Sequence, residues 1–324
     1  MKKKTKWLAV VACLILFALM ALGSGSSDSG EKKDVVAVED HETSNSDDVA
    51  SDETGNADTT EVNEEAASGE ESETSSTSTT IEEQVLVDQD GIVVTATEYV
   101  TDSIWGDGIK LLVENNSEKD VTIGCNALIV NNYMITDLFA SEIAAGKKAN
   151  ETVYLSSSEL KAAGIDTVGQ IEIYFHIYES STWDNIFDTD CVTIQTSEYA
   201  NMDTTPNDEG QELYNEGGVR IVGKTVDENS FWGTAILLYC ENTSGKNVGI
   251  SVDDMSINGF MMSPFFSTTV YDGKKCIDDI TVFSSDLEDN GISAIEEVEL
   301  KFHIFDADSF STITDSEPIT FSAQ

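Results

Sequence analysis

The sequence predicts an all-β protein with two tandem β-sandwich domains, and three observations carry this prediction. The chain repeats itself, because Gly91–Thr196 aligns without a gap on Gly218–Ala323 with 30 of 106 aligned pairs identical. Apolar and polar residues alternate over short stretches, which is typical of strands that have one buried face. Turn-forming residues interrupt these stretches often, and about seven short strands in about 110 residues indicate two packed sheets.

The length of the repeat indicates domains and not solenoid units. The two copies lie 127 positions apart, from residue 91 to residue 218, whereas solenoid units recur every ~20–50 residues. A segment of this size can bury roughly 60–70% of its unfolded surface and so form its own core. We therefore expect an internal duplication, with repeat 1 at 84–197, a linker at 198–210 and repeat 2 at 211–324.

Individual elements follow from local patterns within each copy. Alternation predicts strands around Ile109–Val113, over Ile171–Tyr178 and over Cys191–Thr196. Asn131-Asn132 and Asn258-Gly259 stand between apolar runs and predict hairpin turns, because Asn and Gly tolerate a positive φ. A serine cap and a terminal glycine predict one short helix over 158–163.

The pattern of residues 1–23 at the N-terminus predicts an export or anchoring signal. Four lysines precede an apolar run from Trp7 to Leu22, and such a run predicts a membrane-inserted helix. Three interpretations stay open: an uncleaved membrane anchor, a signal peptide cleaved before Ser24, or a lipoprotein-like anchor through Cys13. All three place the rest of the chain outside the cytoplasmic membrane, at the cell surface, or secreted if the N-terminus is cleaved. A retained or lipidated N-terminus makes the cytoplasmic membrane a partner.

Residues 24–83 form a segment of different composition. They hold 19 acidic residues against Lys32 and Lys33, and no aromatic residue. Such a segment cannot bury enough apolar surface to offset its chain entropy, so we expect a disordered acidic linker. Sixty flexible residues have a root-mean-square length of roughly 45 Å, which suits a stalk. An inert acidic tail is the alternative.

The charge of the chain argues against several classes of partner. The formal net charge is −44, and Arg220 is the one arginine in the sequence. Nucleic-acid binding depends on basic residues, so nucleic acid is not expected as a partner. Arginine-based phosphate sites are not expected either.

The exported N-terminus, the acidic spacer and the Glu-Asn-x-Ser motifs at 114–117 and 241–244 together resemble Gram-positive bacterial surface proteins. Those proteins carry immunoglobulin-like β-sandwich domains without an agreed activity. The resemblance implies an immunoglobulin-like fold for both copies and a membrane-anchored or secreted location. It brings no functional residues with it.

The histidines of the two repeats are the first candidates for chemistry. His176 and His303 correspond in the alignment, and each follows a glutamate by four residues, Glu172 and Glu299. On a strand these positions share a face, so each pair offers two metal ligands or an acid–base pair. A zinc site needs three or four ligands, and a polar sheet face explains the pairs equally well.

Aromatic and basic residues offer candidate ligand-binding positions. Trp105 and Trp232 correspond, and each follows a polar loop; an exposed tryptophan stacks on sugars, whereas a buried one closes a core. Adjacent lysines also recur in both copies, and they can contact an anionic wall polymer or lie solvated in turns. These lysines are Lys147, Lys148, Lys274 and Lys275.

The cysteines do not correspond between the copies, so any disulfide is specific to one copy. They are Cys125 and Cys191 in repeat 1 and Cys240 and Cys276 in repeat 2. We also find no Gly-rich phosphate loop, Gly-x-Ser-x-Gly or His-Glu-x-x-His motif in the sequence.

The sequence therefore predicts a non-enzymatic surface protein without a cofactor. It binds or adheres to a cell-wall polymer or another surface protein, or it displays a partner. An accessory structural domain of a surface complex is the alternative. A metal-dependent enzyme that uses Glu172 and His176 is the third hypothesis.

Overall fold

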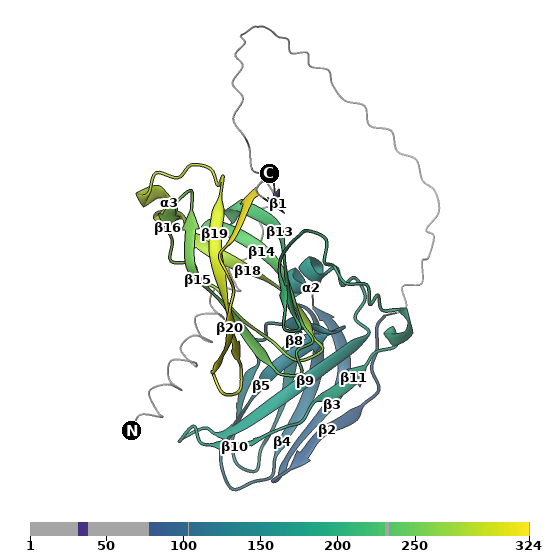
Figure 1. Ribbon diagram of the computed structural model, residues 1–324. Coiled ribbons are helices and arrows are strands. Elements are labelled where there is room, and N and C mark those ends of the chain that lie inside the picture. The colour runs from purple at the N-terminus through teal and green to yellow at the C-terminus, as the bar shows by residue number, and fades with distance from the viewer. Residues whose placement is uncertain (1–31, 38–77, 103, 231–232, 324) are drawn as a thin grey trace, which may run out of the picture. The chain divides into compact units, whose positions relative to one another are not determined.

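The computed structural model describes residues 32–37, 78–102, 104–230 and 233–323 (Figure 1). Contacts group these residues, apart from Ser78, into one compact unit. They form 21 strands, two short α-helices and one 3-10 helix, so the predicted all-β class is confirmed. The predicted apolar helix at 1–23 lies outside the described residues, as does most of the acidic linker. Among the helices that are described, none has the length and apolarity needed to cross a membrane.

The first half of the fold contains two sheets that face one core. One sheet contains β2 (Gln84–Gln89), β3 (Ile92–Asp102), β4 (Gly106–Asn115) and β8 (Lys148–Tyr154), in that order. In the other, β5 pairs with β6, β7 and β9, and β9 pairs with β10 and β11. Their bounds are β5 Val121–Val130, β6 Tyr133–Ile135, β7 Ala140–Ile143, β9 Gln170–Glu179, β10 Asn185–Asp188 and β11 Val192–Gln195, with α2 at Ser157–Ala163.

The second half has the same pairing scheme. Strands β12, β13, β14 and β18 pair in order, while β15 pairs with β16, β17 and β19, and β19 pairs with β20 and β21. Their bounds are β12 Gln211–Glu216, β13 Val219–Ser230, β14 Gly233–Asn242, β15 Val248–Ile257, β16 Phe260–Met261, β17 Ser267–Val270, β18 Lys275–Phe283, β19 Val298–Asp306, β20 Thr312–Asp315 and β21 Ile319–Ala323, with α3 at Ser284–Asp289.

Each element from β2 to β11 has a counterpart 127 positions later. For example, β4 and β14 start at residues 106 and 233, and β5 and β15 start at residues 121 and 248. Each half therefore has ten strands where the sequence predicted about seven, because the short strands β6, β7 and β10 carry too few residues to show an alternating pattern. The predicted strands over 109–113 and 171–178 are present as parts of β4 and β9, and β11 covers 192–195 of the predicted strand over 191–196.

Two clusters of buried apolar side chains lie at the centres of the halves. The first joins the two sheets of the first half through residues such as Val94, Ile109 and Phe175. The second does the same with Ile221, Leu238, Phe302 and others. Val222, Tyr239 and Ile277 of the second half belong to the first cluster, so apolar packing continues between the halves.

Direct contacts also join the two halves. The short strand β6 pairs in parallel with β18, where Lys275 lies opposite Tyr133. The 3-10 helix at Tyr199–Asn201 begins the connection between the halves. Further along it, the Asn207 amide nitrogen donates to the Tyr133 hydroxyl at 2.9 Å. The predicted linker 198–210 is thus in contact with the first half.

One segment of the predicted disordered linker is a strand. Strand β1 (Lys33–Ala37) pairs antiparallel with both β13 and β21. The prediction rested on the average composition of 24–83, which hides the short apolar sequence Val35-Val36. Val35 is buried in the core of the second half, so for these five residues the prediction of disorder was wrong.

The hairpin turns and the short helix are present where the sequence predicted them. Asn131, Asn132 and Asn258 have positive φ, as a tight hairpin requires. The helix α2 ends at Gly164 in the left-handed conformation, which only glycine adopts without steric cost.

Candidate functional site

The outer faces of β9 and β19 carry the histidines singled out from the sequence. Along β9 the residues Ile171, Ile173, Phe175 and Ile177 are fully buried, so the alternate residues point away from the core. His176 stands on this outer face, and His303 stands on the equivalent face of β19. The alternation thus predicted the orientation of both histidines.

In the first half, His176 begins a row of stacked rings. Its imidazole lies 5.5 Å from the Tyr178 ring, and Tyr178 stacks on Trp183 at 5.0 Å with an interplanar angle of 19°. The His176 ring lies over Gly124 of β5, where a Cβ atom would come within 2.8 Å of Nε2. The absence of a side chain at Gly124 lets the ring lie against the sheet.

The second half repeats this row with different rings. His303 stacks on Phe305 at 5.6 Å, and Phe305 stacks on Phe310 at 6.2 Å. These residues are the counterparts of His176, Tyr178 and Trp183, each 127 positions later. Here Gly249 provides the space, because a Cβ atom at that position would come within 2.1 Å of the Phe305 ring. We call the two rows the aromatic rows.

Both aromatic rows end at an exposed ring on a strained hairpin. Trp183 and Phe310 are 53% and 68% exposed, and their φ angles are 61° and 56°. A bulky residue in this left-handed region is uncommon and costs on the order of 1–3 kcal/mol. In each hairpin the ring's amide donates to the carbonyl four residues earlier, at 2.8 Å. The two turns therefore hold an aromatic ring outward in the same way.

Polar side chains surround the histidine of the first row. The Nδ1 atom of His176 lies 2.9 Å from the Asn126 Oδ1 atom, and the Asn126 amide donates to Asp188 Oδ1 at 2.9 Å. Burial lowers the pKa of His176, and the negative charge of the nearby Asp188 offsets part of this effect. Glu172, the predicted partner of His176, is not part of this group.

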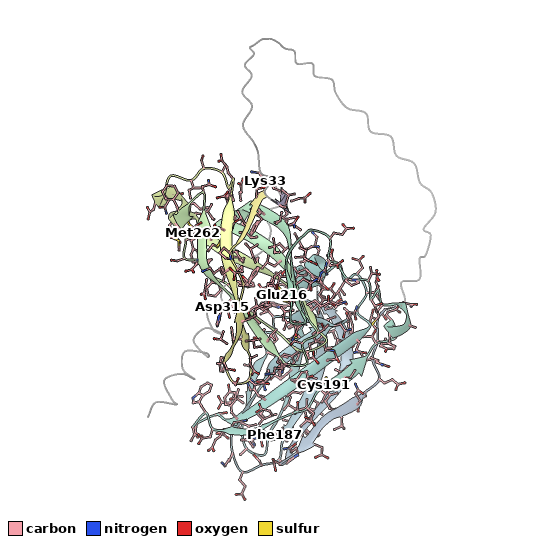
Figure 2. The ribbon with its side chains drawn as sticks, viewed as in Figure 1. Lys33, Phe187, Cys191, Glu216, Met262 and Asp315 are labelled. Atoms are coloured by element: carbon pink, nitrogen blue, oxygen red, sulfur yellow. The ribbon has the colours of Figure 1, made fainter. Side chains whose placement is uncertain are left out.

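At the equivalent place in the second half, an aspartate replaces the asparagine. Asp253 corresponds to Asn126, and Asp315 (labelled in Figure 2) corresponds to Asp188. His303 Nδ1 lies 2.5 Å from Asp315 Oδ1, and one ligand atom from each of the three residues lies within 4.8 Å of the others. One imidazole and two carboxylates can hold a divalent cation. The predicted ligand Glu299 is exposed and does not belong to this group.

Glu172 and Lys274, predicted for two different sites, meet in one ion pair. The ammonium of Lys274 lies 2.5 Å from Glu172 Oε2, and both side chains are largely buried. Lys274 also donates to Asn132 Oδ1 at 3.1 Å, and Tyr174 packs edge-to-face on Tyr271 close by, at 5.1 Å. The pair connects the two halves, so neither residue is available to a metal or an anionic polymer as predicted.

The other predicted lysines have separate surroundings. Lys148 forms an ion pair with Glu114 of the neighbouring strand, and Lys147 is exposed in the turn before it. The ammonium of Lys275 lies 5.7 Å from the centre of the Tyr133 ring, in the contact between the halves. The four lysines therefore do not form one basic surface.

The predicted tryptophan platform is described only in the first half. Trp105 is 54% exposed and lies 6.0 Å from the Tyr154 ring, so it does not close the core. Trp232 lies outside the described residues. Tyr154 corresponds to Thr281, so the second half has no aromatic residue at the position of Tyr154.

Sequence reasoning missed the residues that complete the two sites. Tyr178 was assigned only to a strand, and Phe305, Asn126 and Asp253 were not singled out. The alignment held a signal for them, since an aromatic residue follows each histidine by two positions and another by seven. Asp188 and Asp315 are also identical in the alignment. The turn that folds each hairpin tip back over its strand could not be predicted from the alternation.

Comparisons with known proteins give no family for the chain. No family model matches it, and no curated protein matches it either. Among solved structures, the YadV chaperone is 12% identical, with 70% of this chain and 98% of that chain covered, at a TM-score of 0.22. A protein of unknown function from Porphyromonas gingivalis W83 is 10% identical, with 67% and 89% covered, at a TM-score of 0.20.

Proposed function

We propose that this chain is a non-enzymatic binding protein of the cell surface, tethered to the cytoplasmic membrane through residues 1–23. Its binding part consists of two tandem immunoglobulin-like β-sandwich domains, 84–197 and 211–324, which arose by duplication. The observation that supports this best is the recurrence of the aromatic row. Each half presents a histidine, a second ring and an exposed terminal ring at equivalent positions.

The recurrence favours a binding role because stability alone does not explain it. Burying Trp183 or Phe310 would contribute more to folding than exposing it, and the left-handed backbone adds a cost. The ring type has changed between the halves, from Tyr178 to Phe305, while the stack has remained. What both halves retain is a flat apolar surface ending at an exposed ring.

A cell-wall polysaccharide is the ligand class that this surface fits. A sugar ring has an apolar C–H face that packs flat on an aromatic ring, and its hydroxyl groups hydrogen-bond with nearby polar side chains. Each row has such groups at its inner end, Asn126 and Asp188 in one half and Asp253 and Asp315 in the other. The net charge of −44 favours a neutral polymer over an anionic one, because an anionic chain would be repelled.

The test compares binding by the full-length protein and variants of the two terminal rings. We expect Trp183→Ala and Phe310→Ala each to weaken retention on insoluble wall polysaccharide by about 5- to 10-fold, since an aromatic contact contributes about 1 kcal/mol. The double variant should lose retention almost fully. Phe260→Ala is the matched control, because Phe260 is an exposed ring of the second half outside the row.

The same experiment separates binding from the alternative, an accessory structural role. A protein that only supports a surface complex would retain no polysaccharide, and the two substitutions would change nothing. The contact between the halves through Lys274 and Glu172 suits either role, so it does not decide between them.

A further inference from the structure

Strand β1 occupies a groove in the second half that the other strands of the second half leave open. Lys33 and Asp34 pair with Val226 and Thr225 of β13, and Val35, Val36 and Ala37 pair with Ala323, Ser322 and Phe321 of β21. The strand thus lies between the edges of the two sheets and pairs with both. Without it, these parts of β13 and β21 would present unpaired backbone groups, which are prone to pair with another strand.

The first half fills the equivalent place with residues next to its own first strand. There Ile81 forms a bridge with Thr196, and Thr196 corresponds to Ala323. The residue that corresponds to Ile81 in the second half is Asp208, which forms an ion pair with Arg220 at 2.7 Å instead. Val35 takes the vacated place opposite Ala323. In the second half the distant strand β1 therefore pairs with the end of the last strand, whereas in the first half the nearby residue Ile81 does so.

The groove recognises specific side chains of β1. Val35 is 3% exposed, and its Cγ1 atom lies so close to Gly223 that a Cβ atom there would come within 2.6 Å. Lys33 (labelled in Figure 2) forms an ion pair with Glu228 at 3.0 Å. The groove thus selects an extended segment with a lysine and, two residues later, a small β-branched residue. Alternate side chains give the specificity, and the main chain gives the affinity.

We propose that the groove between β13 and β21 is a peptide-binding site for extended strands, which Lys33–Ala37 occupies as an exchangeable ligand. Its ligand in trans is the same segment of a second copy of this chain, which satisfies every contact described above. Five residues form few hydrogen bonds, so β1 can leave while the rest of the fold stays intact. The covalent connection holds β1 near its groove at an effective concentration on the order of 1 mM, so exchange needs a high local density of chains.

The test uses a fluorescein-labelled peptide, KKDVVAVE, with the sequence of residues 32–39. We expect full-length Val35→Asp protein to bind the peptide, because a buried carboxylate ejects its own β1 from the groove. The wild-type protein should bind it at least about 10-fold more weakly, since its groove is occupied. A peptide with Val35→Asp should bind neither protein. Adding Gly223→Ala to the Val35→Asp protein should weaken binding at least about 10-fold, because the new methyl group fills the space for Val35.

Two further measurements keep the proposal open to refutation. Hydrogen exchange on the wild-type protein should show protected amides over residues 33–37, and rapid exchange there would overturn the proposal even if the variants fail to fold. Sedimentation of the wild-type protein at rising concentration should show dimers that Val35→Asp abolishes. Equal peptide binding by wild-type and Val35→Asp proteins, or dimers that survive Val35→Asp, would also overturn it. Polysaccharide retention is independent of these results.

Discussion

At the residue scale, two buried asparagines explain the Glu-Asn-x-Ser motifs. Asn115 is fully buried at the end of β4, and its amide donates to the carbonyls of Lys119 at 2.7 Å and Ile143 at 2.9 Å. Its Oδ1 atom accepts from the amide of Ser117 at 3.0 Å. Asn242 makes the equivalent bonds in the second half. The buried asparagine of the motif that resembles other surface proteins therefore stabilises a turn.

Replacing Asn115 by alanine should destabilise the protein strongly. The change leaves two carbonyl groups and an amide without partners in a buried place, and each unsatisfied group costs about 1–3 kcal/mol. We expect the free energy of unfolding in urea to fall by about 2–4 kcal/mol. Asn116→Ala is the control, because Asn116 is exposed and should change stability little.

The exchange of Asn126 for Asp253 between the halves gives a reciprocal test. Asn126 both accepts from and donates to its neighbours, whereas Asp253 adds a second negative charge beside Asp315. Asp253→Asn should therefore raise the free energy of unfolding by about 0.5–1 kcal/mol by restoring the bridging amide. Asn126→Asp should lower it by a similar amount. Changes of the same sign in both variants would contradict this explanation.

At the element scale, the register of the strands places two cysteines opposite each other. Cys240 of β14 pairs with Cys276 of β18, both are buried, and the four described cysteines, which include these two, are free thiols. Opposite residues on antiparallel strands have Cα atoms about 4.5–5.5 Å apart, a range that a disulfide can bridge. The sequence could not reveal this, because the pairing depends on which strands become neighbours.

Oxidation should join Cys240 to Cys276. With oxidised glutathione as the oxidant, each new protein disulfide takes two hydrogen atoms from the two thiols and yields two molecules of reduced glutathione. We expect peptide mapping without reductant to find the Cys240–Cys276 link, and dithiothreitol to reverse it. Cys125 and Cys191 should stay unlinked, and a link between them in place of Cys240–Cys276 would contradict the observed register.

At the scale of the whole molecule, a group of carboxyl groups lies where the halves meet. Glu159 of α2 interacts electrostatically with Asp279 and Asp278 of β18 across the halves. Burial raises the pKa of Glu159 to about 7 and that of Asp278 to about 7, and it raises the pKa of Asp137 beside them to about 6. The folded molecule is therefore most stable when these three carboxyl groups are protonated.

The stability of the molecule should consequently fall as the pH rises. A carboxyl group whose pKa is higher in the folded state than its unfolded value near 4 stabilises the fold below that value. The contribution is lost as the pH rises through about 6 to 7. We expect Asp278→Asn and Glu159→Gln to remove about 1–2 kcal/mol each of this pH dependence in urea unfolding. Asp286→Asn, at the position that corresponds to Glu159, is the control and should leave the pH profile unchanged.

Sequence patterns predicted the molecule well where structure depends on neighbours in the chain. Alternation located β4, β9 and β11, and Gly164 located the end of α2. The same patterns could not predict the ion pair of Lys274 with Glu172, since it joins residues about one hundred positions apart. They also missed β1, because Val35 becomes buried only when β1 pairs with two distant strands.

The docking of β1 decides which part of the molecule bears mechanical load. If residues 1–23 hold the chain at the membrane, a pull on the protein travels along the backbone to Lys33 and enters the fold there. The force then acts on the pairs that β1 makes with β13 and β21, while β2 to β11 stay off the load path. Tension would thus break the pairing of these five residues first. Their release would lengthen the tether before either half is stretched.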